Sequence, residues 1–167
     1  DRTSGILRAR EAVSFREGNK NLTSDRLIYH RETDSVAVEG SFSLNIPAMQ
    51  GVAAGGGLQY SVRGGRATMT RRPTFRRERG DGSQLLISAR TIGANLHDET
   101  LDCGGFFRAA SKEAVITARS GLFEHGNEQL TLSGEVEFRM KATSDSIVTA
   151  LRADSMRVDL EDGRLAH

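Results

Sequence analysis

The chain has no tryptophan, few aromatic residues of any kind, one cysteine and two prolines among its 167 residues. A single cysteine excludes an intrachain disulfide, and Cys103 is most simply a small buried hydrophobe. Because the sequence places no base beside it, Cys103 is a poor candidate nucleophile. No apolar run approaches the roughly 18–20 residues that a membrane-spanning helix needs. The length suits one domain with a real core, so we expect a single domain over residues 1–167.

Motifs that carry catalysis are also missing. The sequence contains no HExxH, no nucleophile elbow, no Walker glycine loop and no paired-cysteine metal motif. The four histidines are scattered along the chain: His30, His97, His125 and His167. The first three fall at or beside expected turns, and we interpret them as solvated turn residues. No pattern brings acidic residues together for acid–base work. We therefore expect neither an enzyme nor a metal or cofactor site.

What the sequence does contain is an internal repeat. Residues 22–29, with the sequence LTSDRLIY, return in weakened form at roughly 30-residue intervals. The best copies begin at residues 87–89 and 116–118, and weaker copies in the same phase run through 58–69 and 151–165. A repeat of this length indicates one supersecondary unit used several times.

Each copy predicts a β-hairpin. Apolar residues alternate with polar ones along both arms, which is the period of a strand with one buried face. Polar turns separate the arms at 31–34, 124–127 and 161–163. Residues 71–82 and 141–146 lie outside the repeat, and we expect loops or long hairpin connections there. The fold class predicted is all-β, a folded antiparallel sheet built from about five repeated β-hairpin units.

Three glycines, Gly40, Gly105 and Gly134, interrupt the second arm of the hairpins at equivalent positions. A residue without a Cβ tolerates a bulge or a sharp bend, so we expect the long strands to bend there. The glycine run at 55–57 lacks the lysine and the helix that phosphate binding requires, and it indicates another bend. In the first arm the alternation shifts by one residue after Ser24, since Leu22 and Ser24 stand at even positions and Leu27 and Tyr29 at odd ones. This shift predicts a bulge.

A basic cluster stands out on a chain whose net charge is only +1. It contains Arg71, Arg72, Arg76, Arg77 and Arg79, and the first four are the candidate contact residues. Guanidinium groups bind phosphate and carboxylate in a bidentate manner, so the cluster could contact an anionic lipid headgroup or an acidic partner. A solvated loop kept in solution by its charge is the plainer alternative. Nucleic acid is disfavoured, because the cluster lacks stacking aromatics and the rest of the chain is not basic.

The repeat resembles the OstA-type repeat of bacterial lipopolysaccharide transport, which LptA, LptC and the N-terminal domain of LptD share. The best stretches are 22–42 and 116–136, and residues 13–18 match the lead-in that precedes the family's repeat. Two positions depart from the pattern. Glu11 stands where the lead-in usually has glycine, and Arg119 replaces the aspartate of the fourth copy.

The resemblance implies an open β-jellyroll in the Gram-negative periplasm, whose apolar interior shields the acyl chains of lipopolysaccharide during outer membrane biogenesis. Such a protein needs no cofactor, because burial of acyl chains alone contributes about 25 cal/mol per Å² of apolar surface removed from water. Edge strands left exposed at its ends would pair with other Lpt proteins or with a second copy of the chain. The four arginines are candidate headgroup contacts.

The candidate residues of an apolar, ligand-binding groove are the alternating apolar residues of the second arms: Val36, Val38, Phe42, Leu101, Cys103, Phe107, Leu130, Leu132, Val136 and Phe138. Each of them could equally pack in a filled core. A structural or adhesive β-repeat module without a ligand therefore stays open as an alternative. A carbohydrate-active β-solenoid enzyme is a third interpretation, and the scarcity of aromatics counts against it.

The two ends of the chain cut the repeat near the same phase, since it begins at Asp1 without methionine and stops at His167. We expect either that a targeting segment, with or without an inner-membrane anchor, precedes Asp1, or that the chain is an excised domain of a longer sheet.

Overall fold

The computed structural model describes residues 5–78, 82–141 and 147–160, which form one 14-stranded antiparallel sheet. The strands in chain order are β1 (Ile6–Glu17), β2 (Lys20–His30), β3 (Ser35–Ile46), β4 (Gly51–Ser61), β5 (Arg66–Thr70), β6 (Thr74–Glu78), β7 (Gln84–Ser88), β8 (Thr91–Asn95), β9 (Thr100–Gly104), β10 (Phe107–Ala110), β11 (Ala114–Ala118), β12 (Ser120–Glu124), β13 (Gln129–Lys141) and β14 (Ile147–Asp159). A short 3₁₀ helix, η1 (Pro47–Met49), joins β3 to β4. The all-β class predicted from the sequence is confirmed.

The sheet folds over itself into two facing layers. The first layer contains β5, β8, β9 and β12, and the second contains β6, β7, β10 and β11. β4 belongs to both layers, because its residues 57–61 pair with β5 and its residues 51–54 pair with β6. β13 does the same, pairing with β12 through 129–133 and with β11 through 137–140. We call the line along which the strands pass from one layer to the other the crease.

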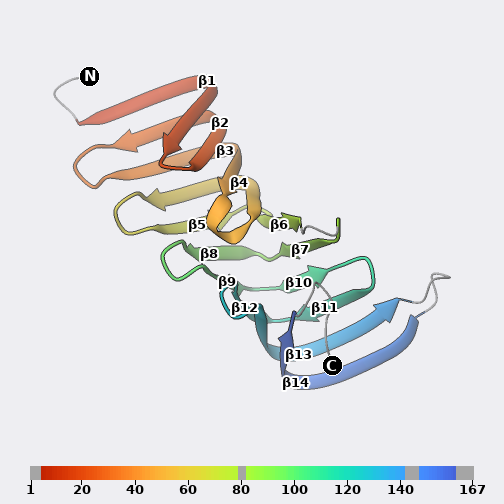
Figure 1. Cartoon of the computed structure of the whole chain (residues 1–167). Helices are drawn as coiled ribbons and strands as arrows, with labels where there is room; N and C mark the ends of the chain where they lie inside the picture. The colour runs from red at the N-terminus through yellow and green to blue at the C-terminus, as the bar shows by residue number, and fades with distance from the viewer. Residues whose placement is uncertain (1–4, 79–81, 142–146, 161–167) are drawn as a thin grey trace.

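β1 and β14 lie at opposite ends of this folded sheet (Figure 1). β1 pairs with β2, and β14 pairs with β13. Within the described ranges neither strand has a partner on its other side. The protein is thus a column of strands with a hydrogen-bonding edge at each end.

The strands bend at the crease where the glycines predict it. Gly40 and Gly134 lie in the bulges of β3 and β13, and Gly105 separates β9 from β10. Their φ angles are 130°, 77° and 84°, which favour glycine over residues with a Cβ. β2 is bulged between Ser24 and Leu27, as the change of parity predicts. Each arm of a hairpin therefore crosses both layers.

The loop predicted over residues 71–82 is wrong in part, because Thr74–Glu78 form β6. Phe75 and Arg77 point into the space between the layers, and the charge of Arg77 hides this alternation from a hydrophobicity pattern. The glycine run at 55–57 lies where β4 crosses the crease, as expected for a bend. Arg79, the segment 142–146, the turn predicted at 161–163 and His167 lie outside the described residues.

We expect Gly134→Ala to lower the free energy of unfolding by about 1–2 kcal/mol, since an L-residue with a Cβ is disfavoured at positive φ. A Cβ on Gly134 would also lie 2.8 Å from Arg119 Cδ. Urea unfolding followed by circular dichroism measures the change. The matched control is Gly126→Ala in the β12–β13 turn, where no atom lies within 4 Å of the added Cβ. Equal losses in both variants would contradict this account of the crease.

Candidate functional site

The apolar residues predicted to line a groove all point into the space between the two layers. They are Val36, Val38, Phe42, Leu101, Cys103, Phe107, Leu130, Leu132, Val136 and Phe138, and each is at most 5% exposed. They belong to one hydrophobic cluster that extends from Leu22 in β2 to Val158 in β14. Through the middle of the molecule the space between the layers is therefore filled with side chains.

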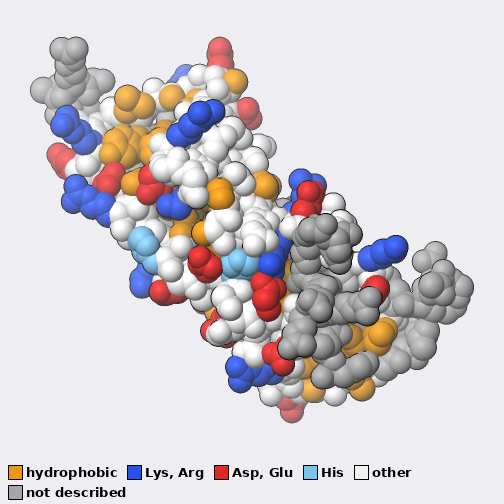
Figure 2. Space-filling view, viewed as in Figure 1, with side chains coloured by type: hydrophobic (Ala, Val, Ile, Leu, Met, Phe, Trp, Pro, Cys, Tyr) orange, Lys and Arg blue, Asp and Glu red, His pale blue; other side chains and the backbone are white. Residues whose placement is uncertain are grey.

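The interior reaches solvent at both ends of the column. Leu7 of β1 and Leu151 of β14 lie on the inward face, opposite Tyr29 and Phe138 in the strand register. They are nevertheless 59% and 47% exposed, because none of the strands that the structure describes covers them. Figure 2 shows hydrophobic side chains at the surface near the upper end, over β1–β3, and again near the lower end, beside β13 and β14.

A pocket lies at the crease near each end. The first, of about 400 Å³, lies over the bulges of β1, β2 and β3 and is lined by Val13 and Phe42 among small polar residues. The second, of about 570 Å³, lies over the bulge of β13 and is lined by Val136 together with charged residues of β13 and β14. Phe42 and Val136, both among the predicted groove residues, thus border these two pockets.

The four candidate arginines of the predicted basic cluster do not form one patch. Arg71 and Arg72 are exposed at the crease between β5 and β6. Arg76 is exposed on the outer face of β6, with its Nε 3.9 Å from Glu78 Oε1. Arg77 is only 6% exposed and points between the layers.

Opposite the crease the two layers end in turns, and we call the space between these turns the mouth. Toward the β1 end, the Tyr60 hydroxyl on β4 donates a hydrogen bond to Glu17 on β1, and Lys20 Nζ lies 3.0 Å from Glu17 Oε2. Burial and this hydrogen bond raise the pKa of Tyr60 well above its ordinary value. β1 and β4 are not neighbours in the sheet, so this contact bridges the two layers.

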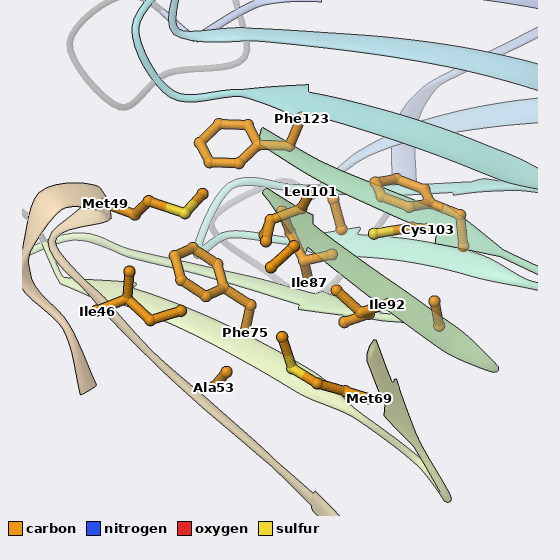
Figure 3. Close-up of a cluster of buried hydrophobic side chains, with 14 of the residues drawn as sticks. Ile46, Met49, Ala53, Met69, Phe75, Ile87, Ile92, Leu101, Cys103 and Phe123 are labelled. Atoms are coloured by element: carbon orange, nitrogen blue, oxygen red, sulfur yellow. The ribbon is translucent and has the colours of Figure 1, made fainter. Parts of the chain in front are cut away.

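A second polar contact bridges the mouth toward the β14 end. Arg77 Nη1 on β6 donates a hydrogen bond of 2.6 Å to Glu128 Oε2 in the turn between β12 and β13. His125 Nδ1 in the same turn lies 3.3 Å from Glu128 Oε1. Beside this ion pair, the side chain of Met49 in η1 points toward Phe75 and Phe123, which belong to opposite layers (Figure 3). The mouth is therefore closed by apolar packing flanked by polar contacts.

Sequence patterns missed these contacts across the mouth. Phe75 was the one local signal for the inward face of β6, because Arg77 is charged like its neighbours Arg76 and Glu78. No local signal joins Glu17 to Tyr60 or Arg77 to Glu128, since each pair is far apart in the chain. His30, His97 and His125 do lie at or beside turns, as predicted, but the prediction that all three are solvated is wrong for His125, whose side chain is only 10% exposed.

The described residues contain no helix with the length and hydrophobicity to span a membrane. Nor do they contain a group of His, Cys, Asp and Glu side chains that could hold a metal ion.

These features define an all-β jellyroll whose apolar interior is open at two ends. The structure is similar to the crystal structure of LptH from Pseudomonas aeruginosa, described as the LptA-homologous periplasmic component of the conserved lipopolysaccharide transport device. The TM-score is 0.59 with 9% sequence identity, and the match covers 95% of this chain and 96% of that one. At this identity the likeness establishes an LptA-like fold. No family model matches the chain, and no curated protein matches it.

Cys103 provides a direct test of the filled interior. Its side chain is fully buried on β9, and burial, with a smaller contribution from Asp102, raises the pKa of the thiol to about 12. We expect the thiol at pH 8 to react with a small disulfide reagent at least about 100-fold more slowly in the folded protein than in urea, because labelling requires opening. The absorbance of the released thiolate measures both rates. Similar rates would show that solvent reaches the interior freely.

Proposed function

We propose that the chain is a periplasmic lipopolysaccharide-binding component of a transport bridge to the outer membrane, which shields acyl chains between its two layers. The observation that supports this most is the apolar interior, which runs from β1 to β14 and meets solvent at Leu7 and Leu151. The LptA-like fold supports it further. The mechanism needs no chemistry, because transfer of acyl chains from water contributes about 25 cal/mol per Å².

The acyl chains would contact the inward residues of the second hairpin arms. The proposed lining is Val36, Val38, Phe42, Leu101, Phe107, Leu130, Leu132, Val136 and Phe138. Because these side chains are buried against one another, a bound chain must replace contacts between the layers. Two of the proposed lining residues, Phe42 and Val136, border surface pockets near the ends of the column.

The headgroup of such a lipid would stay at the mouth, where water remains in contact with it. Arg71 and Arg72 lie at the crease, on the opposite side from the mouth. Arg76 is on the outer face of β6, and Arg77 lies at the mouth itself. Of the four candidate headgroup contacts, Arg77 is therefore the best placed.

Site-specific photo-crosslinking to lipopolysaccharide tests the proposal. A photoreactive residue at Phe42, Leu132 or Val136 should crosslink to the lipid, because all three side chains point inward. The control position is Thr131, which is exposed on the outer face of β13 between two inward leucines. Crosslinking at none of the inward positions, in variants that circular dichroism shows to be folded, would contradict the proposal.

We also propose that the edges of β1 and β14 pair with other proteins of the bridge or with a second copy of the chain. An edge strand presents unpaired backbone donors and acceptors, and a new strand would extend the sheet and the interior together. It would also cover Leu7 or Leu151, which none of the described strands covers.

A charge placed at these end positions should weaken the assembly. Leu7→Glu and Leu151→Glu should each shift the self-association of the protein to at least about tenfold higher concentration, since a carboxylate resists burial at the joint. Sedimentation velocity over a concentration series measures this shift. Leu122→Glu is the control, because Leu122 is 37% exposed but lies on the central strand β12. Equal effects at all three positions, or a wild-type chain that stays monomeric throughout, would contradict the pairing of copies of the chain through these edges.

One observation favours a second candidate, a structural β-repeat module without a ligand. The middle of the interior is filled with side chains, as such a module requires. The crosslinking experiment separates the two functions, since a module with a permanently filled core captures no lipid.

A further inference from the structure

Among the residues that the structure describes, Arg77 is the only Lys, Arg, Asp or Glu that is buried. Its position follows from the alternation of β6, which places Phe75 and Arg77 inward and exposes Arg76 and Glu78. An inward arginine at the rim of an apolar core is costly to desolvate unless it is paired. The role of Arg77 therefore depends on which group pairs with its guanidinium.

The partner of Arg77 is supplied by the opposite layer. Glu128 belongs to the turn between β12 and β13, whereas β6 is bonded to β4 and β7. The Glu128 carboxylate receives the 2.6 Å hydrogen bond from Arg77 Nη1 through one oxygen and lies near His125 through the other. The turn itself is well anchored, because Leu160 N donates a 2.6 Å hydrogen bond to Glu128 O. This ion pair thus joins two elements that no backbone pairing joins.

An ion pair differs from the apolar contacts around it in one respect. Methionine and phenylalanine side chains hold the layers together only while they touch, and nothing specific replaces them. A guanidinium can exchange one oxyanion for another, since carboxylate and phosphate offer the same bidentate geometry. Arg77 also has an N–H group available for a further acceptor, because in the described part of the chain its Nε has no hydrogen-bond partner.

We propose that the Arg77–Glu128 pair is a latch that closes the mouth, and that Arg77 exchanges Glu128 for an anionic group of the ligand when the mouth opens. The first half concerns the fold alone. The second half rests on the proposed function, and it makes Arg77 the residue that favours anionic amphiphiles over neutral ones with the same acyl chains.

The latch is tested with native Cys103 as a reporter of the interior. Glu128→Gln removes the charge that holds Arg77, and the rate of thiol labelling in the folded protein should rise at least about tenfold. The charge-reversed double variant Arg77→Glu/Glu128→Arg rebuilds the pair and should return the rate to within about threefold of wild type. Should Glu128→Gln fail to fold, Arg77→Met/Glu128→Gln buries no unpaired charge and carries the same expectation.

The matched control is Glu135→Gln, which removes the ion pair with Arg119 on the outer surface, where both side chains are more than two-thirds exposed. Its labelling rate should not change. An unchanged rate in Glu128→Gln would overturn the latch. So would a faster rate that rises with urea in step with global unfolding, because the pair would then support stability alone. A local opening leaves the rate flat at low urea.

The exchange is tested by competition between lipid A and lipid A from which the phosphates have been removed, with a photoreactive residue at Leu132. Wild type should capture the phosphorylated lipid at least about tenfold better, and Arg77→Met should capture both equally. A preference that survives in Arg77→Met would overturn the exchange. Capture of neither lipid by any variant would overturn the proposed function and the exchange together, while the thiol rates would still decide whether the pair is a latch.

Discussion

The bend of each long strand at the crease is the constraint on which the rest of the structure depends. Side chains alternate along a strand with a period of two, so a strand that changes layer must turn without sending its apolar side chains outward. Glycine at positive φ allows the turn in β3 and β13. A Cβ on Gly105 would lie 2.8 Å from Arg90 Cβ, and a Cβ on Gly134 would lie 2.8 Å from Arg119 Cδ. Arginine stems from the connections between β7 and β8 and between β11 and β12 thus occupy the space that the glycines leave.

Because this constraint is local, much of the fold could be predicted from the sequence. The alternation and the polar turns identify the hairpins, and the interrupting glycines identify the bends. The prediction fails for β6, where Arg77 occupies an inward position and breaks the apolar pattern. It also misses the closure of the mouth, since Glu17 meets Tyr60 and Arg77 meets Glu128 only after the sheet has folded over. Contacts between layers carry no periodic signal along the chain.

The candidate site shows a further limit of sequence patterns. The copies of the repeat look alike in sequence, so Leu132 in an inner strand and Leu151 in a terminal strand are equally apolar and equally in phase. In the structure the first is fully buried and the second is 47% exposed, because burial requires a neighbouring strand on each side. The pockets beside Phe42 and Val136 likewise lie near the two ends. Position in the column, which no single copy encodes, decides which inward residues a ligand can reach.

A filled interior changes where ligand selection would take place. An acyl chain that enters between the layers replaces apolar side-chain contacts with apolar lipid contacts, and this exchange discriminates weakly because neither contact is directional. The polar contacts across the mouth are different, since breaking them leaves Arg77 and Tyr60 without their partners unless the ligand supplies new ones. Selectivity would therefore lie in a few polar residues at the mouth, while the many apolar residues inside would accept any chain that fits. A conduit through which the ligand must keep moving benefits from this division, because no inner position holds the acyl chains in a deep minimum.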